Sequence, residues 1–203
     1  SGAILIWNLT GQVVSTLGGH TAHVSCVSFS PDGNHVLSGS EDNTASLWDA
    51  TNGKLVHTFS GHREAVNAVA FSPDGTHIAS GSRNGQIRLW AAASKQLLHS
   101  IEYDNKRLRG MCFDEDGGHI VAIHDDLVTM WSTELAEKVD EWQLPDLSTR
   151  VYHLPVAFSS GGTTFAFCNP KSDGVSVFGN IGSLQKELFI LREAGSSCLA
   201  FSP

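Results

Sequence analysis

Residues that would mark several classes of protein are scarce in this sequence. Charged side chains make up only 17% of its 203 residues, no more than two Lys or Arg residues are adjacent, and the formal net charge is −8. Nucleic-acid binding needs a positive surface to neutralise phosphates, so we expect no nucleic-acid partner. No apolar stretch approaches the roughly 20 residues that span a bilayer, so we also expect no membrane partner.

Cysteine is also sparse, and no two cysteines have the short spacing of a zinc site. The four cysteines are Cys26, Cys112, Cys168 and Cys198, and they lie in apolar runs such as VSCVSF. Buried free thiols are typical of a reducing compartment, whereas two disulfides are the alternative. We therefore predict a cytoplasmic location.

What the sequence has in abundance is a repeat of about 42 residues. Tryptophans recur at 41, 42 and 41 residues, and SPDG turns recur with the variants DEDG and SSGG (Trp7, Trp48, Trp90 and Trp131; turns from Ser30, Ser72, Asp114 and Ser159). Each period holds four short runs rich in β-branched and aromatic residues, separated by turn residues. Four antiparallel strands per period form the blade of a β-propeller. We predict an all-β fold with four full blades at 19–60, 61–102, 103–146 and 147–191, and partial blades at 1–18 and 192–203.

The pairs Gly19-His20 with Trp48-Asp49, and Gly61-His62 with Trp90-Ala91, resemble the WD-repeat (WD40-type) family. The early repeats are similar to the near-consensus WD arrays of fungal NACHT-type signalling proteins. In this family a hydrogen-bonded tetrad locks each blade, because an indole, a hydroxyl, an imidazole and a carboxylate can bond in series. Counting 6, 10 and 28 residues back from each tryptophan, the resemblance implies two tetrads, His20, Ser38, Asp42 and Trp48, and His62, Ser80, Asn84 and Trp90.

The third repeat departs from this pattern. The same offsets from Trp131 give Asp125, Val121 and Tyr103, so we expect no tetrad there and a blade held by packing alone. A His, Ser and Asp in one blade could suggest a hydrolase, but no nucleophile elbow or oxyanion donor pair accompanies them. The sequence therefore predicts no catalytic residue, no cofactor and no metal site.

The resemblance implies a binding face made of the loop after each GH pair and the residue before each tetrad Asp. The candidate partner-binding residues are Glu41, Arg63, Glu64, Arg83 and His124, a mixture that suits a charged peptide. We predict a non-catalytic scaffold that binds a protein or peptide. A carbohydrate-binding propeller is the alternative, and it would need exposed aromatics such as Tyr103, Trp142 and Tyr152. A propeller hydrolase is a third possibility, and it would need carboxylates around a central channel.

The number of repeats bears on assembly. The sequence holds about five repeats, whereas WD-repeat rings usually have seven blades, so the resemblance implies a piece of a larger ring. A closed five-bladed ring is the alternative. An open arc would expose unpaired strand edges, which predicts self-association.

Overall fold

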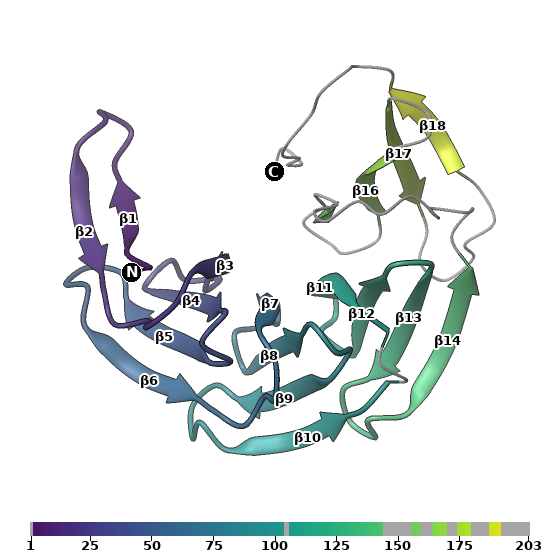
Figure 1. The fold of residues 1–203 in the computed structure, drawn as a ribbon, viewed down its shortest axis with the longest axis horizontal. Helices are drawn as coiled ribbons and strands as arrows, with labels where there is room; N and C mark the ends of the chain where they lie inside the picture. Colours follow the sequence, from purple (N-terminus) through teal and green to yellow (C-terminus); the bar gives the residue numbers. More distant parts are fainter. Residues whose placement is uncertain are drawn as a thin grey trace. The chain divides into compact units, whose positions relative to one another are not determined.

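A computed structural model describes residues 2–103 and 106–143, and gives the backbone of four further strands between residues 156 and 191. The chain divides into two units, Ser1–Leu108 and Arg109–Pro203, and each is described by itself (Figure 1). The described residues form strands and turns, as the repeat predicts. Among them, no helix is long and apolar enough to cross a membrane.

The first unit holds a two-stranded sheet followed by two four-stranded sheets, all antiparallel. The two-stranded sheet contains β1 (Ile4–Trp7) and β2 (Val13–Leu17). The next contains β3 (Val24–Phe29), β4 (His35–Ser40), β5 (Ala45–Asp49) and β6 (Leu55–Phe59). The third contains β7 (Val66–Phe71), β8 (His77–Ser82), β9 (Ile87–Ala91) and β10 (Leu97–Ile101).

The second unit holds two more four-stranded antiparallel sheets. One contains β11 (Leu108–Phe113), β12 (His119–His124), β13 (Leu127–Ser132) and β14 (Lys138–Gln143), of which Leu108 itself is the last residue of the first unit. The other contains β15 (Val156–Phe158), β16 (Thr164–Asn169), β17 (Gly174–Gly179) and β18 (Glu187–Leu191). In every four-stranded sheet the strands lie in the order of the chain, as in a propeller blade.

The SPDG turn determines where each first strand ends. The hydroxyl of Ser30 accepts from the amide of His35 at 2.9 Å, and the carboxylate of Asp32 accepts from the amide of Asn34 at 3.0 Å. Gly33 adopts a φ of 72°, a left-handed conformation that glycine allows at no steric cost. The turn from Asp114 keeps this geometry because the carboxylate of Asp114 replaces the serine hydroxyl as acceptor for the amide of His119, at 3.0 Å.

One hydrophobic core of the first unit lies between its two four-stranded sheets, and a second packs Leu17 of β2 against Val36 and Trp48. Leu37 and Leu47 of one sheet pack with Val66 and Ile78 of the next, and all four are at most 2% exposed. Strands β3 and β7 lie side by side, and a Cβ added to Gly39 would stand 2.7 Å from the side chain of Val66. These two blades therefore share an apolar core, because a single sheet cannot cover its own faces.

The strand directions place the connections at two ends of each blade. We call the loops leading into β3 and β7, with the β4–β5 and β8–β9 turns, the GH end. We call the β3–β4, β5–β6, β7–β8 and β9–β10 turns the SPDG end. Because successive strands are antiparallel, these two sets lie at opposite ends of the strands.

The repeat bounds and the cysteines can be compared with the sequence predictions. The four sheets fall within the predicted repeats 19–60, 61–102, 103–146 and 147–191. Cys26 and Cys112 are free thiols, and burial raises the pKa of Cys26 to about 12. Three predicted features lie outside the described residues: the SSGG turn from Ser159, the residue Tyr152 and the partial blade at 192–203. The side chains of Cys168 and Cys198 also lie outside them. The number of blades in a complete ring stays a prediction.

Candidate functional site

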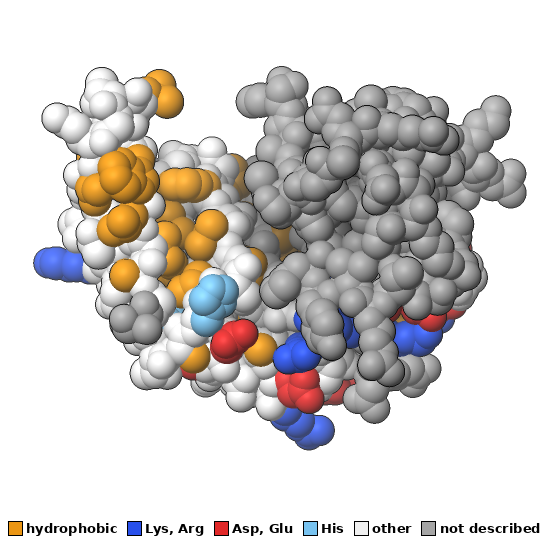
Figure 2. All heavy atoms as spheres, turned by 45° about the horizontal axis from the view of Figure 1, so that its top comes forward, with side chains coloured by type: hydrophobic (Ala, Val, Ile, Leu, Met, Phe, Trp, Pro, Cys, Tyr) orange, Lys and Arg blue, Asp and Glu red, His pale blue; other side chains and the backbone are white. Residues whose placement is uncertain are grey.

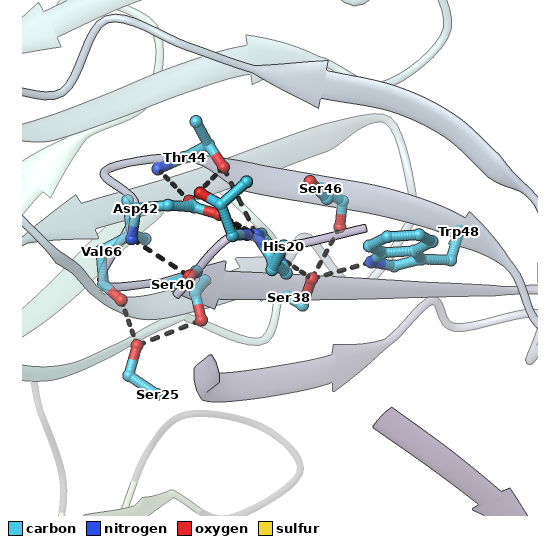
Figure 3. Close-up of polar contacts among 11 residues, drawn as sticks. His20, Ser25, Ser38, Ser40, Asp42, Thr44, Ser46, Trp48 and Val66 are labelled. Carbon is cyan, nitrogen blue, oxygen red and sulfur yellow. Dashed lines mark hydrogen bonds and ion pairs between the residues drawn. The ribbon is translucent and has the colours of Figure 1, made fainter. Parts of the chain in front are cut away.

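The first full blade contains a continuous relay of hydrogen bonds (Figure 3). The indole N–H of Trp48 donates to the hydroxyl of Ser38 at 2.8 Å, and that hydroxyl lies 2.8 Å from Nε2 of His20. Nδ1 of His20 lies 2.8 Å from Oδ2 of Asp42. An ionised carboxylate can only accept, so Nδ1 of His20 is the donor in the last bond. The structure thus brings together the four residues in the order that the offsets from Trp48 predict.

The carboxylate of Asp42 accepts hydrogen bonds from both segments of the GH end, the loop before β3 and the β4–β5 turn. It accepts from the amides of Thr21 and Thr44, each at 3.0 Å, in addition to His20. Burial by itself raises the pKa of Asp42, but hydrogen bonds from Thr44, His20 and Thr21 outweigh it and lower the pKa to about 2. Asp42 is therefore ionised at neutral pH, and it ties the loop before β3 to the β4–β5 turn.

The second blade differs from the sequence prediction at one residue. Trp90, Ser80 and His62 are bonded as expected, with 2.9 Å from the indole nitrogen to Ser80 and 2.7 Å from Ser80 to Nε2 of His62. However, Nδ1 of His62 lies 3.0 Å from Oε1 of Gln86. Asn84 accepts instead from the hydroxyl of Ser82 and the amide of Gln86, at 2.5 and 3.3 Å.

The assignment of Asn84 to the tetrad is therefore wrong. Gln86 occupies the position of Thr44, and its longer side chain reaches the imidazole, while the shorter Asn84 caps its own turn. Gln86 is 2% exposed, and its amide nitrogen also donates to Oε1 of Glu102 at 2.5 Å. Burial, with the nearby Arg88 guanidinium, lowers the pKa of His62 to about 4, so this imidazole is neutral at pH 7.

The third blade has a relay that the offsets miss. The indole of Trp131 donates to the hydroxyl of Thr129 at 2.8 Å, and that hydroxyl lies 3.1 Å from Nε2 of His124. Thr129 lies on β13 opposite Ala122, in the register where Ser46 lies opposite Ser38. In this blade the hydroxyl of the relay comes from β13 instead of β12. The expectation that packing alone holds the third blade is therefore wrong.

His124 is also misplaced by the sequence prediction. In the third blade Trp131 pairs with Ile120, 11 residues before it, whereas in the first blade Trp48 pairs with Val36, 12 residues before it. The β12–β13 hairpin is therefore one residue shorter than the β4–β5 hairpin. Counting back from Trp131 therefore lands one position early. His124 is 0% exposed and belongs to the buried relay, so it is not a partner-binding residue. Asp125 is the first residue after β12, the position that Glu41 has after β4. Its carboxylate pairs with the guanidinium of Arg109.

These relays have the chemistry of structural bonds rather than of a catalytic centre. Ser38 and Ser80 are 0% exposed, and each hydroxyl accepts from a tryptophan, so neither can meet a substrate. Within the described part of the chain, no three His, Cys, Asp or Glu side chains are placed to hold a metal ion. His119, which follows the DG pair of its turn, bonds to Asp114 at 2.7 Å instead.

The other four candidate partner-binding residues, Glu41, Arg63, Glu64 and Arg83, are all exposed at the GH end of the first unit. Backbone hydrogen bonds fix this end, since the amide of Glu41 donates to the carbonyl of His23 at 2.9 Å. In the next blade the amide of Arg83 donates to the carbonyl of Ala65 at 2.8 Å. Each turn is thus fastened to the loop beside it while its charged side chain stays free of the core.

The chain is similar to known repeat proteins. A family model described as WD domain, G-beta repeat, matches residues 11–49 and 53–91. The small ribosomal subunit protein RACK1y of Oryza sativa subsp. japonica is 44% identical over 52 residues, which are 25% of this chain and 16% of that protein. Eukaryotic translation initiation factor 3 subunit I of Xenopus tropicalis is 45% identical over 49 residues, which are 24% of this chain and 15% of that protein.

A solved structure extends the similarity beyond these two repeats. The crystal structure of RRP9 WD40 repeats superposes with a TM-score of 0.68 at 24% identity, covering 80% of this chain and 49% of that one. The chain thus spans about half of that structure, and its sequence matches cover less than a fifth of the two relatives. The all-β fold of four-stranded blades is that of a WD40 propeller.

Proposed function

We propose, since this chain contains WD40 repeats, that it is a non-catalytic scaffold that binds a protein or peptide at the GH end of its first two full blades. Proteins with these repeats are typically interaction scaffolds, and two of the relatives are named as a subunit protein of the ribosome and a subunit of an initiation factor. The observation that carries the proposal is the contrast between a buried relay, which ties the loop before β3 to the β4–β5 turn, and the exposed charges beside it.

The four exposed side chains define the kind of partner. Glu41 and Glu64 supply carboxylates, and Arg63 and Arg83 supply guanidinium groups that can bind carboxylates in a bidentate manner. Backbone bonds fix the turns that carry Glu41 and Arg83, so little loop entropy is lost on binding. A peptide with charges of both signs complements this surface.

Selection of peptides from a random display library against the purified chain tests the proposal. Selected peptides should bind the native chain and lose at least tenfold in affinity for Glu41→Lys and for Arg83→Glu. The matched control is Lys54→Glu, an exposed charge reversal in the β5–β6 turn at the SPDG end. Peptides that bind all four proteins equally would contradict the assignment of the GH end.

A second mode of interaction is supported by an apolar edge. Among the described residues β1 pairs only with β2, and Leu5, Trp7 and Val14 are 47%, 57% and 58% exposed. Figure 2 shows hydrophobic side chains gathered on the left of that view, where β1 and β2 lie in Figure 1. We propose that a second copy of this chain covers this edge. Sedimentation velocity should show a dimer that Trp7→Lys abolishes, and a monomer at all concentrations would contradict it.

The remaining functional predictions rest on the sequence alone. A cytoplasmic location, the absence of a nucleic-acid partner and the similarity to the WD arrays of fungal NACHT-type signalling proteins stay predictions. The carbohydrate-binding alternative also stays a prediction, although two of its three aromatics, Tyr103 and Trp142, are half-buried rather than exposed. A glycan array run beside the peptide selection would distinguish it from the scaffold.

A further inference from the structure

A cavity opens between the first two full blades at the SPDG end, away from the loops of the proposed function. Its volume is about 320 Å³, at the lower end of the range of small-ligand pockets. The two blades that form it share one core and belong to the same unit. It is therefore a site built by the stacking of neighbouring blades.

The cavity has an apolar floor. Leu47 of β5 and Ile78 of β8 line it and are 2% and 0% exposed, and the half-buried Phe71 ends β7 beside them. No polar atom of these side chains needs a partner, so water gains little by occupying the floor. An apolar side chain about the size of leucine would bury its surface there.

The rim of the cavity carries negative charge. Asp32 and Asp74, from the two SPDG turns, line the cavity and are exposed. Hydrogen bonds from the hydroxyls of Ser30 and Ser72 lower the pKa of each carboxyl to about 2, so both are ionised at neutral pH. The ammonium of Lys95 also lines the cavity and donates to the carbonyl of Ala92, so the two carboxylates face one ammonium.

We propose that this cavity is a binding site for a basic peptide segment that places one apolar side chain against Phe71, with Leu47 and Ile78 buried beneath it. Lysine or arginine residues beside that side chain lie against Asp32 and Asp74. Charge complementarity selects this occupant, because the two carboxylates outnumber the one ammonium in the lining. The site is separate from the GH end, so it goes beyond the scaffold function and stands or fails independently of it.

The test is a titration of the 203-residue chain with the tripeptide acetyl-Lys-Leu-Lys-amide, followed by methyl NMR. We expect saturable shifts confined to the methyl groups of Leu47, Ile78 and Ala93, which lines the mouth of the cavity. Acetyl-Glu-Leu-Glu-amide and acetyl-Lys-Gly-Lys-amide should bind at least tenfold more weakly, since one reverses the charges and the other lacks the apolar group. Equal binding of the three peptides, or shifts spread over the whole chain, would overturn the proposal.

Matched variants locate the site. Ala93→Trp fills the mouth from an exposed position and should abolish binding, whereas Ser94→Trp, one residue on and outside the lining, should not. Replacing both carboxylates, Asp32→Asn with Asp74→Asn, should weaken binding at least threefold, because asparagine keeps the turn acceptor but removes the charge. The control is Asp49→Asn at the end of β5, a half-buried residue outside the cavity whose carboxylate accepts from Thr51 and Asn52 in the next turn. Unchanged affinity in Ala93→Trp would exclude this cavity as the site.

Discussion

Substituting Asp42 tests whether the relay stabilises the blade. Asp42→Ala removes the acceptor of the His20 imidazole, whose side chain is 1% exposed, and leaves a buried N–H without its partner. An orphaned buried donor costs about 1 to 3 kcal/mol. The lowered pKa of Asp42 agrees in direction, because hydrogen bonds that favour the ionised carboxylate stabilise the folded chain at neutral pH. We expect a loss of about 2 to 3 kcal/mol in the free energy of unfolding.

The assay is urea unfolding followed by tryptophan fluorescence, together with calorimetry. A loss of this size should lower Tm by about 5 to 10 °C in a chain of this length. The control is Asp49→Ala, which removes an exposed carboxylate bonded to Thr51 and Asn52 and should lower Tm by less than a third as much. Equal melting temperatures for Asp42→Ala and the native chain would refute the relay as a stabilising element.

The pH dependence follows from the same carboxylate. The pKa of Asp42 is lower in the folded chain than in the unfolded one, so its contribution to stability is complete above about pH 4. That contribution is lost as the pH falls through about 2. The native chain should therefore lose stability more steeply than Asp42→Ala between pH 4 and pH 2. Parallel curves for the two proteins would contradict the ionised state of Asp42.

Three further predictions concern the second and third blades. Gln86→Ala should cost about 1 to 3 kcal/mol in urea unfolding, whereas Asn84→Asp should change stability little, because Asn84 does not contact the imidazole. If Asn84→Asp stabilises the chain instead, the bond to Gln86 is misassigned. The ring of His62 has a pKa lowered to about 4, so its NMR signals should not titrate between pH 8 and pH 5, and stability should fall as the pH drops from about 6.5 through 4. A midpoint near 6.5 would exclude burial of this neutral ring. Thr129→Val should destabilise by about 1 to 3 kcal/mol because it removes the acceptor of the Trp131 indole, and Thr129→Ser should retain most of the stability. Equal stability of the two Thr129 variants would show that the hydroxyl does not matter.

The repeat alone was sufficient to predict the blades, because the tryptophans and SPDG turns recur at nearly constant spacing. The first relay followed from the same spacing, since the β4–β5 hairpin has the length that the offsets assume. Gln86 could not be predicted this way, because which of two neighbouring polar side chains reaches His62 depends on their lengths and on the local turn. That choice is made by packing, which the offsets do not describe.

The third blade could have been predicted better from the sequence. Trp48 and Trp90 each follow the histidine after the DG turn by 13 residues, but Trp131 follows His119 by 12. This missing residue indicates a shorter hairpin, and aligning the repeats on the histidine would have placed His124 at the end of β12. The role of Thr129 as the hydroxyl of this relay could still not have been predicted, because it depends on the pairing of β12 with β13.

The most direct test of the scaffold function is the map of amide chemical shifts when a selected peptide binds the chain. The account predicts that perturbed amides cluster at residues 21–23, 41, 63–65 and 83, at the GH end of the first two full blades. The relay side chains behind them should keep their hydrogen bonds. Perturbations that cluster elsewhere, with the GH end unaffected, would contradict the account.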